Sequence, residues 1–159
     1  MTPPVRPIIV IYPHAGCGDL DLVRMVEETS AALPFCLDSH GSGEALLGEF
    51  DEIEVSLVSD EVISGVHGEF MEDPTPTDVI TFHHGEIIVS LDTARREGPR
   101  HGNSFAEETL LYIIHGLLHL NGHTDLLEPD RTAMHRVQES ILARVLRRPT
   151  TDPDQTPNR

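Results

Sequence analysis

The feature that most constrains this chain is a histidine pair inside its most apolar stretch, residues 104–125, SFAEETLLYIIHGLLHLNGHTD. His115 and His119 are four residues apart, which places both side chains on one face of a helix, about one turn apart. That arrangement suits joint binding of a single metal ion. Leucines and isoleucines surround the pair, and a buried polar group without a partner costs about 1–3 kcal/mol. The stretch therefore predicts a central, buried helix whose two histidines share a ligand.

The sequence also marks where this helix begins and ends. Ser104 and Glu107 have the spacing of a capping box, and the Asn-Gly pair at 121–122 tolerates a positive φ at the C-terminus. The chain must then turn, which can bring His123 or Asp125 back to the pair as a third ligand. Three protein ligands and an open fourth position are typical of a catalytic metal site, whereas a structural zinc site usually has four.

Glu108 lies seven residues before His115, on the same helical face. Its carboxylate could orient an imidazole by a hydrogen bond, as the groups behind metal-bound histidines do, or it could be a solvated residue of the first turn. No side chain is assigned as the catalytic group. A divalent ion lowers the pKa of its bound water to near neutrality, so metal-bound water is one candidate nucleophile for hydrolysis, and a hydroxyl group of the substrate is the alternative.

Length and composition bound the protein class. A chain of 159 residues suits one domain with a single core. Its apolar runs are too short to span a bilayer, and the segment MTPPVRP lacks the apolar region of a signal peptide. The two cysteines, Cys17 and Cys36, suit a reducing compartment. We therefore expect a cytoplasmic protein with no membrane partner.

The net charge of −16 argues against a broad nucleic-acid-binding surface, because such surfaces neutralise phosphates with Lys and Arg. Nucleic-acid binding would then require a bound cation together with a local arginine cluster. Arg95, Arg96 and Arg100 form the only such cluster before the last helix. The alternative for these three arginines is a solvated helix end.

Hydrophobic periodicity predicts alternating helices and strands along the rest of the chain. Pro34 is expected to end the first helix, Asp92 to cap a short one, and Met134 to fill the core. The eleven residues from Pro149 are expected to form a disordered polar tail, so the domain spans 1–148 and the tail 149–159. The expected strands are 7–12, 52–58, 77–82 and 87–90, the last two forming a hairpin around Gly85 or lying as neighbours in a mixed sheet, and the expected helices are 19–33, 60–70, 92–96, 104–121 and 130–146.

Three motifs resemble the YbeY family of bacterial metal-dependent endoribonucleases, which are implicated in rRNA maturation. They are HGLLHLNGHTD at 115–125, TDVITF at 77–82 and MHRVQESIL at 134–142. The resemblance implies an α+β fold, in which about five helices pack a mixed four-stranded sheet and the metal site lies on the central helix. It also implies one zinc ion per chain, or another divalent metal, and cleavage of single-stranded RNA in an rRNA precursor. The implied partners are RNA and the ribosomal subunit, with no DNA.

The chain departs from the family pattern at two places. The family's third histidine corresponds to Asp125, and its tyrosine corresponds to His123. We therefore expect His115, His119 and Asp125 to bind the metal, with His123 as the alternative third ligand. The family's arginine, seven residues before the aspartate of the TDVITF strand, is Met71 here, which removes a cation suited to phosphate binding.

Two other functions compete with the endoribonuclease. A non-catalytic ribosome-assembly factor with a structural metal is favoured by Met71 and by the acidity of the chain, and disfavoured by a three-ligand site. A metalloprotease of the H-E-x-x-H type carries its general base directly after the first histidine, where this chain has Gly116. Glu108 or Glu86 would have to act as that base without support from their spacing.

Overall fold

The computed structural model describes residues 7–14, 16–18, 20–71 and 78–147, with the side chains of residues 70 and 71 left out. The elements along the chain are β1 (Ile8–Pro13), α1 (Leu22–Leu37), η1 (Leu47–Glu49), β2 (Glu52–Val58), α2 (Asp60–Met71), β3 (Val79–Phe82), β4 (Glu86–Ser90), α3 (Leu91–Glu97), η2 (Pro99–His101), α4 (Phe105–Leu120) and α5 (Asp130–Leu146).

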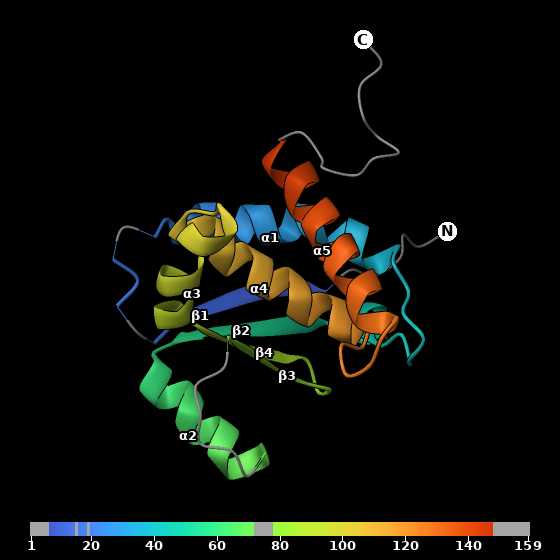
Figure 1. Ribbon diagram of the computed structural model, residues 1–159, viewed down its shortest axis with the longest axis horizontal. Coiled ribbons are helices and arrows are strands. Elements are labelled where there is room, and N and C mark those ends of the chain that lie inside the picture. The colour runs from blue at the N-terminus through green and yellow to red at the C-terminus, as the bar shows by residue number, and fades with distance from the viewer. Residues whose placement is uncertain (1–6, 15, 19, 72–77, 148–159) are drawn as a thin grey trace.

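A four-stranded sheet separates the helices into two layers (Figure 1). Its strand order is β1-β2-β4-β3, in which β1, β2 and β4 are parallel and β3 runs antiparallel to β4. Helices α1, α4 and α5 lie on one side of the sheet, and α2 lies on the other. The predicted fold class, a single α+β domain with a mixed four-stranded sheet and five helices, is confirmed. Within this sheet β3 is an edge strand that joins β4 in the predicted hairpin.

Helix α4 is the central element, as predicted. The Ser104 hydroxyl accepts a hydrogen bond from the Glu107 backbone N at 3.1 Å, and the Glu107 carboxylate accepts one from the Ser104 backbone N at 2.8 Å, which confirms the capping box. Most of the helix circumference is apolar and buried. The fully buried side chains of α4 include Leu110, Ile113, Ile114, Leu117 and Leu118.

Gly116 allows α4 to lie directly on the sheet. A Cβ atom at this position would come within 2.8 Å of Cγ2 of Ile87, a fully buried residue of β4. A glutamate side chain here would overlap Ile87, and it would point at the sheet. The general base of an H-E-x-x-H protease therefore has no room at this position.

The prediction that Pro34 ends the first helix was wrong, because α1 continues to Leu37. The carbonyl groups of its last turn are satisfied by a distant side chain. Asn121 Nδ2 donates to the carbonyl oxygens of Cys36 and Leu37 at 2.9 and 3.3 Å, and Cys36 is fully buried. These tertiary contacts stabilise a turn beyond the proline, which local propensity alone does not predict.

The prediction that Asp92 caps the short helix α3 was also wrong. Ser90 is the N-cap, and its hydroxyl oxygen accepts a hydrogen bond from the Thr93 backbone N at 3.2 Å. The Asp92 carboxylate instead accepts a hydrogen bond from the Asp60 backbone N at 2.8 Å. It therefore joins α3 to the first residue of α2.

Several smaller expectations have clear outcomes. Met134 is fully buried in the core, and Cys17 and Cys36 are free thiols. Gly85 takes a φ of +102° in the β3–β4 turn. Within the described residues, every helix is too short or too polar to cross a membrane. The expected tail, residues 149–159, lies outside the described residues.

We expect Gly116→Ala to destabilise the protein by about 1–3 kcal/mol, because the added methyl overlaps a packed core side chain. That loss should exceed the gain of about 1 kcal/mol from helix propensity. Gly65→Ala in α2 is the matched control, since a Cβ there meets nothing within 4 Å. Urea unfolding of both variants measures the difference. A Gly116→Ala variant as stable as the Gly65→Ala variant would contradict this account of α4 packing.

Candidate metal centre

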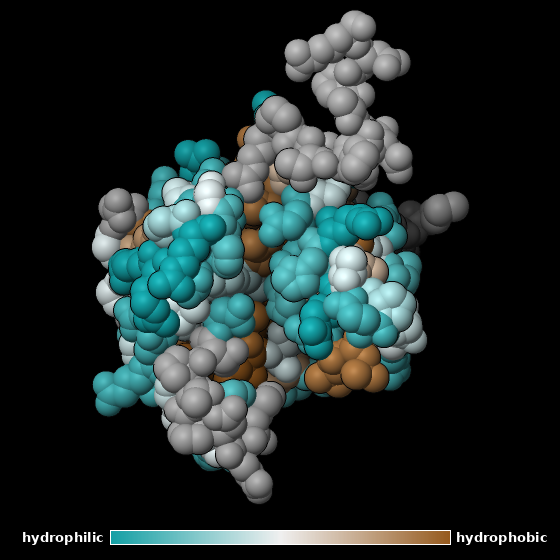
Figure 2. All heavy atoms as spheres, in the orientation of Figure 1, coloured by the Kyte–Doolittle hydropathy of each residue, from teal (hydrophilic) through white to brown (hydrophobic). Residues whose placement is uncertain are grey.

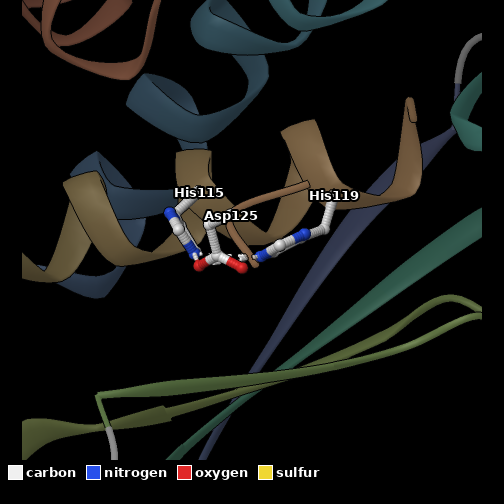
Figure 3. A group of neighbouring side chains, drawn as sticks. All are labelled: His115, His119 and Asp125. Atoms are coloured by element: carbon white, nitrogen blue, oxygen red, sulfur yellow. Dashed lines mark hydrogen bonds and ion pairs between the residues drawn. The ribbon is translucent and has the colours of Figure 1, made fainter. Parts of the chain in front are cut away.

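Three side chains converge beside the C-terminal half of α4 (Figure 3). The Nε2 atoms of His115 and His119 are 3.0 Å apart, and Oδ2 of Asp125 lies 3.3 and 3.6 Å from them. The ligand atoms of a tetrahedral ion with bonds of about 2.0–2.1 Å are about 3.3–3.4 Å apart. Among the described residues, this is the only group of three or more His, Cys, Asp or Glu side chains close enough to share an ion. Its spacing fits three corners of such a coordination sphere.

The hydrogen bonds on the far side of each ring fix where the imidazole protons lie. Nδ1 of His115 donates to Oε1 of Gln138 in α5 at 2.7 Å, and Nδ1 of His119 donates to the carbonyl oxygen of His123 at 3.0 Å. A neutral imidazole with its proton on Nδ1 has a lone pair on Nε2. Both lone pairs therefore point at the same place as the Asp125 carboxylate, an arrangement of three acceptors that suits a shared cation.

The pKa shifts follow from this crowding of acceptors. Burial opposes a charge on His115, yet its hydrogen bonds to Asp125 and Gln138 raise its pKa above the usual value. The hydrogen bond from His115 lowers the pKa of Asp125 to about 2. Burial lowers the pKa of His119, and the nearby His115 lowers it further. Without an ion, a proton between His115 and Asp125 partly neutralises the group.

A tight turn returns the chain from α4 to its histidines. Gly122, directly after the helix, has a φ of +94°. A Cβ on Gly41 would lie 2.2 Å from the Gly122 carbonyl oxygen, so the segment before η1 packs against this turn backbone to backbone. Arg131 completes the support, donating from Nε and Nη2 to the carbonyl oxygens of Asp125 and Leu126, each at 3.0 Å. These contacts hold the backbone of the loop, and the loop in turn positions the Asp125 carboxylate.

The His123 side chain is turned away from the group. It is only 8% exposed, and its Nε2 lies 3.0 Å from Oγ and 3.2 Å from the carbonyl oxygen of Ser39. Burial lowers its pKa. Its backbone carbonyl, by contrast, accepts the hydrogen bond of His119 described above. Sequence reasoning did not identify Ser39 as the partner of this ring, and no local pattern marks it.

Neither expectation for Glu108 describes its environment. The carboxylate is fully buried, and it accepts hydrogen bonds from Nδ1 of His101 at 2.7 Å and Nδ2 of Asn103 at 2.8 Å. The group that orients His115 is instead Gln138, which sequence reasoning missed. A signal was available: Gln138 lies four residues after Met134 within the apolar stripe of α5, where a buried amide needs a polar partner.

The three side chains face a cavity of about 570 Å³. Leu126, one of its lining residues, and the neighbouring Leu127 are 78% and 74% exposed, and a hydrophobic patch lies over this loop in Figure 2. The cavity is therefore large enough for a small organic group and open to solvent. Its described lining comprises Gly43, Glu44, His67, Asp78, Val79, Ile80, Thr81, His83, His115, His119, Gly122, His123, Thr124, Asp125 and Leu126.

The arginine cluster lies elsewhere. Arg96 Nη1 donates to Oδ2 of Asp60 at 2.7 Å, and Arg100 pairs with Glu97 at 3.3 Å. Arg95 lies over the ring of Phe105, with its guanidinium carbon 4.3 Å from the ring centroid. None of these three arginines is among the described residues of the cavity lining. The three arginines therefore form a solvent-exposed helix end, which is the second of the two expectations for this cluster.

Asp125→Asn is expected to lower the pKa of His115 in metal-free protein, because a charged acceptor becomes neutral. The effect on His119 should be smaller, since His115 makes the hydrogen bond to this carboxylate. NMR titration of the imidazole signals measures both. Asp130→Asn serves as the control carboxylate. An unchanged His115 pKa in Asp125→Asn would show that the two side chains do not interact.

Most of the chain is similar to one known protein family. The family described as "Endoribonuclease YbeY" matches residues 20–146. The Endoribonuclease YbeY of Thermus thermophilus is 38% identical over 103 residues, covering 57% of this chain and 74% of the relative. That of Frankia casuarinae is 29% identical over 156 residues, covering 85% of this chain and 73% of the relative.

A solved structure is similar over most of the fold. The solution structure of TM1509 from Thermotoga maritima superposes with a TM-score of 0.56 at 26% sequence identity, covering 86% of this chain and 88% of that one. The family match spans α1 to α5, and therefore includes α4, the turn that follows it and Gln138. This chain belongs to the YbeY family of endoribonucleases.

Proposed function

We propose that this protein is a metal-dependent endoribonuclease that cuts single-stranded RNA during rRNA maturation, with His115, His119 and Asp125 as the metal ligands. The observation that carries the proposal is the convergence of two Nε2 lone pairs and a carboxylate oxygen at the wall of an open cavity. Membership of the YbeY family supplies the reaction class. Three protein ligands leave a coordination position for substrate or water.

Zinc is the metal we propose, one ion per chain. Imidazole nitrogen and carboxylate oxygen bind zinc at similar distances, about 2.0–2.2 Å, so Asp125 can serve where a histidine otherwise would. Two histidines and one carboxylate also suit iron(II) and manganese, which are the competing metals. A divalent ion held here polarises a phosphoryl oxygen and lowers the pKa of water.

The chain's own residues prepare the site for that ion. Gln138 and the His123 carbonyl hold both imidazoles in the tautomer that a metal requires. Arg131 holds the loop that carries Asp125. The open cavity gives an RNA strand access to the group. These contacts orient the ligands before any ion arrives, which reduces the cost of ordering them on binding.

The runner-up is a ribosome-assembly factor with a structural metal. Met71 favours it by removing the family's arginine, although the Met71 side chain lies outside the described residues. The open cavity beside the group disfavours it. Under either function we propose a folded domain of residues 1–148, a cytoplasmic location, and the ribosomal subunit with its RNA as partner. A metalloprotease is opposed by the lack of room at Gly116.

Metal content separates the two third-ligand candidates. Asp125→Ala is expected to lose most bound zinc after dialysis against a weak chelator, because one of three ligands is gone. His123→Ala should retain about one zinc per chain, since that ring faces Ser39. Inductively coupled plasma mass spectrometry measures both. Full occupancy in Asp125→Ala and loss in His123→Ala would show that the wrong residue is assigned.

RNA cleavage tests the function itself. Zinc-loaded protein is expected to cut a labelled single-stranded RNA, and the double variant His115→Ala/His119→Ala, purified in the same way, should lose at least about 100-fold in rate. The double variant shows whether a contaminating nuclease is responsible. Intact RNA in both samples, under conditions where the Thermus thermophilus relative cuts, would favour the assembly factor.

A further inference from the structure

Besides His123, whose ring contacts Ser39, two histidines of the cavity lining lie outside the metal centre. His67 comes from α2, and His83 comes from the turn between β3 and β4. Helix α2 covers the face of the sheet opposite to α4, and β3 is the strand at the sheet edge between them (Figure 1). The cavity therefore reaches around the open edge of β3, from the metal centre on the α4 side to His67 on the α2 side.

The local structure explains why these two side chains face the cavity. Ile63, fully buried against the sheet, precedes His67 by four residues, so the two share one face of α2. His83 and His84 are adjacent in the turn but differ in environment. Nε2 of His84 lies 3.2 Å from Oε1 of Glu86, and His84 is not among the described lining residues. His83 is the member of the pair that faces the cavity.

The described residues of the cavity lining include no lysine and no arginine. The whole chain contains no lysine, and residues 25–94, which include α2, β3 and the turn, contain no arginine. Among the described residues, the lining includes the acidic Glu44 and Asp78 and no arginine. Histidine is the one side chain in this stretch that can gain a positive charge near neutral pH. A phosphate group that enters from the α2 side therefore meets histidine as its cationic partner.

We propose that His67 and His83 bind phosphate groups of the RNA strand that flank the one held at the metal centre. This inference rests on the proposed endoribonuclease function. RNA carries one negative charge per nucleotide, and an acidic cavity repels it unless those charges are met. An imidazole N–H donates to a phosphate oxygen, and the bond strengthens when the ring is protonated. The strand then crosses the edge of β3, and the two histidines contribute to binding and not to the chemical step.

The test measures RNA binding and turnover in the full-length chain. Binding of a labelled single-stranded RNA is followed by fluorescence anisotropy before zinc is added, so that cleavage does not interfere. KM and kcat are then measured with zinc-loaded protein. The variants are His67→Ala, His83→Ala and their combination. The matched controls are His84→Ala in the same turn and His135→Ala on the exposed face of α5.

Each single variant is expected to weaken RNA binding about 5-fold, and the double variant about 20-fold, with KM raised in proportion. kcat, zinc content and both control variants should stay within about 2-fold of wild type. His67→Arg should restore tight binding and steepen its dependence on salt, because a permanent charge replaces a titratable one. That rescue distinguishes a phosphate contact from a folding role.

Other outcomes overturn the assignment. Binding by both alanine variants at the wild-type level would show that neither histidine contacts the strand. A fall in kcat with unchanged binding and KM would place them in the chemical step instead. If wild-type protein binds RNA without cutting it, the proposed function fails while the binding ratios still decide this inference. If wild-type protein binds no RNA, both fail.

Discussion

The arrangement of the three candidate metal ligands depends on two hydrogen bonds that face away from the point where these ligands converge. Because Nδ1 of His115 and Nδ1 of His119 each donate to a fixed acceptor, both Nε2 lone pairs are directed at one point beside the Asp125 carboxylate. These three groups lie 3.0–3.6 Å apart, a spacing that suits a shared cation. The suitability of this group for an ion therefore depends on the acceptors on α5 and on the loop, and the His-x3-His spacing alone does not create it.

The rest of the fold holds those acceptors in position. Gly116 brings α4 onto Ile87 of the sheet, and this contact sets the depth at which the histidines emerge beside β3. Helix α5 then packs on α4 with Gln138 opposite His115. The segment before η1 fixes the turn at Gly122 through backbone contacts too close for any side chain. Each support comes from a different part of the chain, so the site forms only when the whole domain has folded.

Local signals in the sequence predicted the local structure well. Ser104 and Glu107 gave the start of α4, and the apolar pattern gave its burial, because both depend on residues within a few turns of each other. The failures involve partners distant in sequence. Pro34 was expected to end α1, but Asn121, more than eighty residues away, satisfies the last turn. The environment of Glu108 was misjudged and Gln138 was missed for the same reason, since periodicity identifies a buried position but not the group opposite it.

The central claim is that His115, His119 and Asp125 form one metal site and that the His123 ring lies outside it. An anomalous difference map from crystals of the zinc-loaded protein tests this most directly. We predict one peak per chain, about 2.0–2.2 Å from Nε2 of both histidines and from a carboxylate oxygen of Asp125. A peak bound by the His123 ring, or no peak at these three side chains in protein that contains stoichiometric zinc, would contradict the account.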